Sequence, residues 1–297
     1  MYRGRFAPSP SGPLHFGSLV AAVGSYLDAH AHQGEWRVRI EDVDGPRCVP
    51  GAAEDILDTL EAFGFQWHGP VLRQSRRGFA YAEALERLRD AGWVYGCSCS
   101  RRDIAASAVR ESVDGGFAYP GTCRTRSSWI RSPRAWRMRT DNRAVTFDDR
   151  LLGRVSQNLE SDVGDFVLLR ADGFYAYQLA VVVDDAFEGI THVVRGADLV
   201  DSTPRQIWLQ ECLGLPRPEY AHLPVAVTEA GEKLSKQTRA PALDRHGAAS
   251  ELVAALDFLG QSPPRDLAAA SVRDVWEWAF AAWSFGAVPR HRAIVTS

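Results

Sequence analysis

A proline-rich loop that leads directly into a helix, FAPSPSGPLHFGSL at residues 6–19, constrains the fold of this chain more than any other segment. Its three prolines stiffen the backbone, and Gly12 and Gly17 allow it to approach a ligand closely. The helix is predicted to begin near Ser18, and exposed amides at a helix start, with His15 beside them, suit a phosphate group. Taken alone, the loop is equally consistent with an ordinary strand-to-helix turn.

A second motif far along the chain decides between these two interpretations. The segment EKLSKQ occupies residues 232–237, and a proline-flanked His-x-Gly occupies residues 15–17. Together they resemble the two signatures of class I aminoacyl-tRNA synthetases, and their flanking residues narrow the resemblance to the glutamyl branch. Leucine replaces the methionine of the wider class's Lys-Met-Ser-Lys-Ser, which is a mild change. The alternative for the second motif is a solvated turn, and the presence of His15 argues against it.

The chemistry that this resemblance implies is ATP-dependent activation of an amino acid. The carboxylate attacks the α-phosphate while pyrophosphate leaves, so negative charge builds on phosphate oxygens. Such a site needs positive groups and backbone amides already in place. His15, the amides near Gly17, Lys233 and Lys236 supply that combination, and the resemblance makes Lys236 the phosphate lysine. The expected nucleotide is ATP with magnesium.

A glutamate substrate carries two carboxylates and one amine, so its pocket needs arginines or tyrosines and one acid. The resemblance assigns amino-acid contacts to Arg5, Phe6, Ala7, Pro8, Ser9, Glu41, Tyr177 and Arg195. It implies that Glu41 faces the amine and that Arg5 and Arg195 hold carboxylates. Each residue alone also has a structural explanation, as a surface ion pair for the arginines, a strand-end acid for Glu41 and a core residue for Tyr177.

Three cysteines gather in the middle of the chain. Cys97 and Cys99 are one residue apart, and Cys123 closes a Tyr-Pro-Gly-Thr-Cys turn. The spacing predicts a structural zinc site, because a tight turn rarely buries cysteine for packing alone. The alternative is three reduced cysteines packed as small hydrophobes. In the family resembled here, a tyrosine before the last cysteine fills the fourth position, which implies Tyr119.

An arginine-rich stretch follows the third cysteine, with Trp129 and Trp136 interleaved. Its arginines are Arg124, Arg126, Arg131, Arg134, Arg137 and Arg139. Arginines with aromatic residues can pair with phosphates and stack on bases, although a solvated charged face is the commoner outcome. We favour RNA contact only because the opening motif already indicates a tRNA enzyme.

Helices alternate with short strands in both halves of the chain, which predicts an α/β fold with a parallel, Rossmann-like sheet. We expect residues 1–95 to form the first half of the catalytic domain and residues 161–240 the second, with ligands at the carboxyl ends of the strands. Residues 96–160 are expected to form an insertion with the zinc site. Residues 241–297 are expected to form short helices whose aromatic stripe packs back on the core.

Three details complete the predicted fold. Residues 93–95 and 165–170 are predicted strands of the sheet. Thr203 is predicted to cap a helix, with Pro204 at its first position and Gln206 completing a capping box.

Net charge and hydropathy limit the kinds of partner and location that we expect for the chain. The net charge is -3, so no overall basic field indicates a nucleic-acid partner, and RNA contact would be local. The N-terminus lacks a signal-peptide core and no apolar run is long enough to span a bilayer, so we expect a cytoplasmic monomer that contacts no membrane.

The resemblance covers residues 5–236, after which full-length glutamyl-tRNA synthetases continue into large anticodon-binding domains. A chain of this length, with the Cys-x-Cys and Tyr-Pro-Gly-Thr-Cys elements, resembles the glutamyl-Q tRNA(Asp) synthetases. Members of that family attach glutamate to the modified base queuosine in the anticodon of tRNA-Asp. We therefore expect activation of L-glutamate and its transfer to queuosine. The alternatives are a minimal glutamyl-tRNA synthetase that charges a 3′ end, and a non-catalytic ATP- or tRNA-binding regulator.

Overall fold

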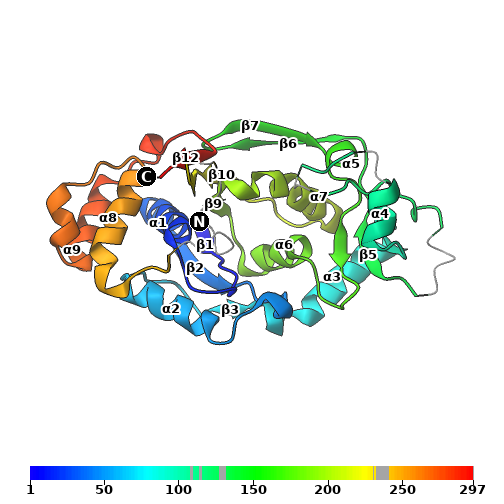
Figure 1. Cartoon of the computed structure of the whole chain (residues 1–297), viewed down its shortest axis with the longest axis horizontal. Coiled ribbons are helices and arrows are strands. Elements are labelled where there is room, and N and C mark those ends of the chain that lie inside the picture. Colours follow the sequence, from blue (N-terminus) through cyan, green and yellow to red (C-terminus); the bar gives the residue numbers. More distant parts are fainter. Residues whose placement is uncertain (108–109, 114–115, 127–131, 230, 232–240, 297) are drawn as a thin grey trace.

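The structure of the chain is a computed structural model, shown in Figure 1, and it has an elongated shape. It describes residues 1–107, 110–113, 116–126, 132–229, 231 and 241–296. Helices α8 (Ala248–Phe258) and α9 (Val272–Ala282) lie at one end. At the other end lie helix α4 (Arg101–Ser107) and strand β5 (Ala135–Met138). No helix within the described residues is both long and apolar enough to cross a bilayer.

Parallel strands form the centre of the molecule. In spatial order they are β3 (Leu72–Arg73), β2 (Glu35–Ile40), β1 (Arg3–Phe6), β9 (His192–Gly196) and β10 (Glu219–Leu223). The two parallel sections meet between β1 and β9, where the Thr191 amide donates to the Arg3 carbonyl oxygen at 3.0 Å. The prediction of an α/β fold with a Rossmann-like parallel sheet is confirmed.

Helices cover the parallel strands and supply most of the core. They are α1 (Phe16–Ala31), α2 (Ala52–Ala62), α3 (Gly78–Asp90), α6 (Tyr177–Glu188) and α7 (Thr203–Leu213). Helix α1 is buried almost all round, because the strands cover one side and α8 and α9 cover the other. Trp276 of α9 is 5% exposed and its indole nitrogen donates to the Phe63 carbonyl oxygen at 2.8 Å. The C-terminal aromatic stripe therefore packs back on the core, as predicted.

A separate antiparallel sheet contains the two strands that were predicted to extend the parallel sheet. Its strands are β4 (Val94–Cys97), β5 and β8 (Val167–Leu169), in that order. The prediction that residues 93–95 and 165–170 belong to the parallel sheet is therefore wrong. Strand β5 comes from the arginine-rich stretch and pairs antiparallel with both neighbours. Strands of three or four residues carry too little pattern to specify their partners.

The remaining elements connect these parts. They are the hairpin β6 (Ala144–Asp149) and β7 (Gly153–Asn158), helix α5 (Leu159–Asp162), and strands β11 (Val225–Val227) and β12 (Ala293–Val295). Short 3-10 helices occur at Gly45–Arg47, Gln74–Arg76, Ala197–Ser202, Arg245–Gly247, Arg265–Ala269 and Phe285–Ala287. The hairpin joins the parallel strands through β6, which pairs with β10 at Asp149 and Tyr220. Strand β12 pairs parallel with β11, so the C-terminal segment lies beside β11.

Candidate active site

The opening loop lies at the carboxyl edge of the parallel strands. It leaves β1, and its Pro8 and Pro10 carbonyl oxygens accept hydrogen bonds from the amides of Glu41 at 3.0 Å and Val49 at 2.9 Å. Gly12 has a φ of 140°, which an L side chain would rarely adopt. The loop is thus tied to the segment that follows β2, at the edge where ligands of parallel α/β sheets bind.

His15 stands at the start of helix α1. The helix begins at Phe16, two residues before the predicted start, and the His15 carbonyl oxygen accepts from the Ser18 amide at 2.9 Å. Gly17 is in the first turn, whose amides face the loop side. His15 also bridges Ala242 in an antiparallel pair, so the chain downstream of the second motif returns to this point. Lys233 and Lys236 lie outside the described residues.

Strand ends bring the predicted glutamate residues together. Arg5 is the penultimate residue of β1, Glu41 directly follows β2, Arg195 is the penultimate residue of β9, and Tyr177 begins α6. Burial raises the pKa of Tyr177. Arg195 and Arg5 act to lower this pKa and Glu41 acts to raise it, so all three charges act on the Tyr177 phenol. Arg195 Nη1 donates to the Tyr177 hydroxyl at 3.2 Å.

The other four residues of the predicted glutamate set differ in burial. Phe6 is 7% exposed and stacks near Trp36, with 6.2 Å between ring centroids, so it is a core residue. Ala7 and Pro8 are half-buried, and Ser9 is exposed in the loop.

A buried ion network surrounds Arg39, which sequence reasoning missed. Arg39 is fully buried and donates to Asp185 and to Glu188, both at 2.7 Å, and to Glu41 at 3.4 Å. Arg5 reaches the same Asp185 through Nε at 3.2 Å and Nη2 at 3.5 Å. The available signal was the acidic cluster DDAFE in an otherwise apolar segment, because buried acids need buried cations.

The pKa of Glu41 lies near neutral pH. It is 8% exposed, and burial raises its pKa to about 7, although Arg39 and Arg5 act in the opposite direction. A positive group that binds beside such a carboxyl stabilises its ionised form and lowers its pKa.

Arg195 is held in place by side chains that were not predicted to take part. Its Nη2 donates to Thr203 Oγ1 and Gln206 Oε1, both at 2.9 Å. These two residues were predicted to form a capping box, and that prediction is wrong. Ser202 occupies the N-cap position, and no side-chain cap hydrogen bond is formed there. Arg195 is 5% exposed, which also excludes its explanation as a surface ion pair.

A histidine orients the same guanidinium from the other side. Arg195 Nε lies 3.2 Å from His222 Nε2, and His222 Nδ1 lies 2.6 Å from Asp149 Oδ2. Burial lowers the pKa of His222 to about 4, so the ring is neutral at pH 7. Nδ1 then donates to Asp149 and Nε2 accepts from Arg195. Sequence reasoning missed this chain, whose residues are scattered over β6, β9 and β10.

The three clustered cysteines meet at one point. The sulfur atoms of Cys97, Cys99 and Cys123 lie within 4.8 Å of one another. The Tyr119 hydroxyl lies 3.4 Å from Cys97 Sγ and 3.5 Å from Cys99 Sγ. Ligands on a tetrahedral zinc with bonds of about 2.3 Å stand roughly 3.8 Å apart, so these four donor atoms fit a metal ion.

Three of the six arginines in the arginine-rich stretch form side-chain hydrogen bonds within the protein. The arginines with protein partners are Arg124, Arg137 and Arg139. Arg137 is 8% exposed, donates to the Asp165 carbonyl oxygen at 2.7 Å and lies 4.1 Å from the Tyr119 ring centroid. The other three are Arg126 and Arg134, which are exposed, and Arg131, which lies outside the described residues. RNA contact therefore remains a prediction for the exposed pair.

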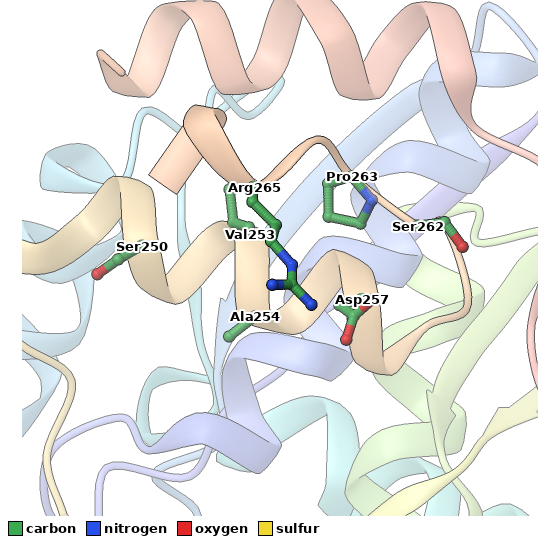
Figure 2. A pocket seen from close by; sticks show the side chains of 7 residues that line it. All are labelled: Ser250, Val253, Ala254, Asp257, Ser262, Pro263 and Arg265. Carbon is green, nitrogen blue, oxygen red and sulfur yellow. The ribbon is translucent and has the colours of Figure 1, made fainter. Parts of the chain in front are cut away.

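A cavity of about 370 Å³ lies beside α8 in the C-terminal region, as Figure 2 shows. Asp257 and Arg265 line it, together with small and apolar side chains. It contains none of the predicted site residues. The motif residues at the strand ends, rather than this cavity, locate the candidate active site.

Comparisons with known proteins show the family to which the chain belongs. The family model described as tRNA synthetases class I (E and Q), catalytic domain, matches residues 1–251. The glutamyl-Q tRNA(Asp) synthetase of Dechloromonas aromatica is 67% identical over 294 residues, which are 99% of this chain and 98% of that protein. The protein of the same name from Aromatoleum aromaticum is 60% identical and covers 97% of this chain and 91% of its own length.

Two solved structures share the fold. The glutamate-tRNA synthetase of Elizabethkingia anophelis superposes with a TM-score of 0.79 at 26% identity, over 100% of this chain and 68% of that chain. A glutamate tRNA ligase of Elizabethkingia meningosepticum, solved in complex with its amino acid, gives a TM-score of 0.78 at 27% identity, over 98% and 66%.

Proposed function

The chain belongs to the class I tRNA synthetases of the glutamate and glutamine type, and from that premise we propose that it activates L-glutamate with ATP and transfers it to queuosine in tRNA-Asp. The observation that carries the proposal is the 67% identity, over nearly the full length of both chains, to a protein named for that reaction. The buried side chains of mixed charge at the strand ends support glutamate as the amino acid.

Glutamate would bind with its ammonium group at Glu41 and its carboxylates at Arg5, Tyr177 and Arg195. The neutral His222 and its neighbours fix Arg195 before substrate arrives, so little reorganisation accompanies binding. Arg5 is fixed in the same way by Asp185.

In the first step, a glutamate carboxylate oxygen forms a bond to the α-phosphorus of ATP, and the bond to pyrophosphate breaks. His15, the first-turn amides of α1 and the two lysines of the second motif would stabilise the developing charge. ATP is expected as its magnesium complex. In the second step, a queuosine hydroxyl oxygen attacks the activated carbonyl carbon, an ester forms, and AMP and a proton leave.

The experiment that tests the acceptor uses labelled glutamate and purified tRNA-Asp with and without queuosine. We expect label only on the queuosine-containing tRNA. Equal labelling of both forms, or labelling of tRNA-Glu, would support the minimal glutamyl-tRNA synthetase instead. Absence of glutamate-dependent pyrophosphate exchange would favour the non-catalytic regulator.

Glutamate binding should depend on pH through Glu41. Because burial raises the pKa of Glu41 to about 7, the carboxylate is mostly protonated at pH 6 and mostly ionised at pH 8. Only the ionised form attracts the substrate ammonium, so the KM for glutamate should fall about tenfold between pH 6 and pH 8. Pyrophosphate exchange measures this, and Glu41→Gln should raise the KM and flatten its pH dependence. A wild-type KM independent of pH would remove Glu41 from the amine site.

We also propose that the cysteine cluster holds one structural zinc. Three thiolates and the Tyr119 hydroxyl supply four donors at suitable separations. Protein purified without chelator should contain about one zinc per chain, and Cys123→Ser should lower that content and the melting temperature. Cys212→Ser, which changes a cysteine outside the cluster, is the matched control. Metal analysis that finds no zinc in the wild-type protein contradicts the proposal.

A further inference from the structure

A second pocket, of about 230 Å³, is lined by residues that neighbour two members of the proposed glutamate site in the chain. Asp42, in one wall, directly follows Glu41 in the chain. Phe174 and Tyr175 also line the pocket, three and two residues before Tyr177, the first residue of helix α6. A molecule in this pocket would therefore lie next to bound glutamate, although none of its lining residues belongs to the predicted glutamate set.

Two polar groups of the pocket, the Asp42 carboxylate and Gln74 Oε1, are hydrogen-bond acceptors held in fixed positions. Both oxygens of Asp42 accept from Ser75, one from its amide at 2.8 Å and one from its hydroxyl at 2.7 Å. Gln74 is fully buried and its Nε2 donates to Asp184 at 2.9 Å. Since a carboxylate only accepts, the Gln74 nitrogen faces Asp184, and Oε1 has no partner among the described residues. A buried acceptor without a partner gains from any donor that reaches it.

Aromatic rings form the apolar part of the wall. The Tyr81 and Tyr175 rings pack edge to face with 5.5 Å between centroids, and the Tyr81 hydroxyl is anchored on Asp184 at 2.6 Å. Phe174 lies against Gly45, where a Cβ would come within 3.2 Å of its ring. The wall is therefore set before any ligand binds.

This combination selects the chemistry of the occupant. Among the described residues that line the pocket there is one carboxylate, Asp42, and neither lysine nor arginine. Such a pocket suits a ring that carries hydroxyl donors and a positive charge, and it disfavours a phosphate. Queuosine carries a cyclopentene ring with a cis diol and a secondary amine, which is protonated at neutral pH. A 3′-terminal ribose also has a cis diol, but it carries no cation.

We propose that this pocket binds the aminocyclopentenediol ring of queuosine, with Asp42 accepting from its hydroxyl or ammonium protons and with Phe174 and Tyr175 covering its apolar face. This inference rests on the proposed function, because it names the subsite that recognises the acceptor. It makes the pocket the place where queuosine is distinguished from guanosine.

Asp42→Asn tests the pocket. Transfer of glutamate to queuosine-containing tRNA-Asp is measured as kcat/KM and divided by the rate of pyrophosphate exchange of the same preparation, which corrects for folding and for the first step. Loss of a charged hydrogen-bond partner should lower this ratio about 10–100-fold. Phe174→Leu should lower it as well. The matched control is Asp172→Asn, since Asp172 is exposed, pairs with Arg170 and does not line the pocket.

The possible results distinguish failure of the pocket assignment from failure of the proposed function. An unchanged ratio in Asp42→Asn, with a wild-type enzyme that requires queuosine, overturns the pocket and leaves the proposed function standing. Tighter tRNA binding by Asp42→Asn, equal for queuosine and guanosine forms, would indicate a phosphate in the pocket and also overturns the inference. A wild-type enzyme that charges both forms equally overturns the proposed function, and the pocket assignment with it.

Discussion

Lys236→Ala should lower the rate of glutamate-dependent pyrophosphate exchange about 100- to 1,000-fold while changing the KM for glutamate little. The proposed role of this lysine is to neutralise charge that develops on phosphate oxygens, and a group of that kind acts mainly on the transition state. Steady-state exchange kinetics at varied glutamate and ATP measure the split between kcat and KM.

The composition of the chain sharpens this test. Lys233 and Lys236 are its only lysines, so all the other basic side chains among the 34 lysines and arginines are arginines. An amine-selective acylating reagent can therefore modify only these two side chains and the N-terminal amine. ATP with glutamate should protect the lysines, and mass spectrometry can follow them. Equal losses of kcat and glutamate affinity in Lys236→Ala, without protection by ATP, would indicate a structural lysine.

Arg39→Met should lower the melting temperature by about 5–10 °C at pH 8. Arg39 is fully buried and contacts three buried carboxylates, those of Glu41, Asp185 and Glu188. Removing one member of a buried ion pair typically costs about 3–5 kcal/mol, because the remaining charge has no compensation. Thermal unfolding followed by circular dichroism gives the shift.

The stability loss should shrink as the pH falls. Burial raises the pKa of Glu41 to about 7, so this carboxyl becomes mostly neutral below pH 7 and needs the arginine less. Burial shifts the pKa of Glu188 upward as well, so its response has the same sign. The matched control is Arg37→Met on the same strand, since Arg37 is half-buried and pairs with the partly exposed Glu35. An equal loss of stability in the two variants would contradict the buried-network account.

The parts of the fold that could be predicted from sequence depend on local patterns. Pro-Gly loops, helical apolar spacing and the aromatic stripe that contains Trp276 are readable within one segment. The sheet to which β4 and β8 belong is not, because their shared partner β5 is separated from them by long stretches of chain.

The predicted site shows the same division. The resemblance to the glutamyl branch assigns Arg5, Glu41 and Arg195 to the site, which stays a prediction, and no sequence pattern indicated their partners. Thr203 and Gln206 fit a capping pattern equally well, and only the three-dimensional structure brings them to Arg195. Sequence reasoning overlooked Arg39 because an arginine in a strand is usually exposed, whereas here three acids accompany it into the core.

The most direct test of the central claim is to charge queuosine-containing tRNA-Asp from which the 3′-terminal nucleotide has been removed. A folded chain of this size has a radius of gyration of about 19 Å, so one active site engages one end of a tRNA. The account predicts that labelled glutamate is attached to the trimmed tRNA at the same rate as to the intact tRNA. Loss of charging on trimming would show that the acceptor is the 3′ end and would contradict the account.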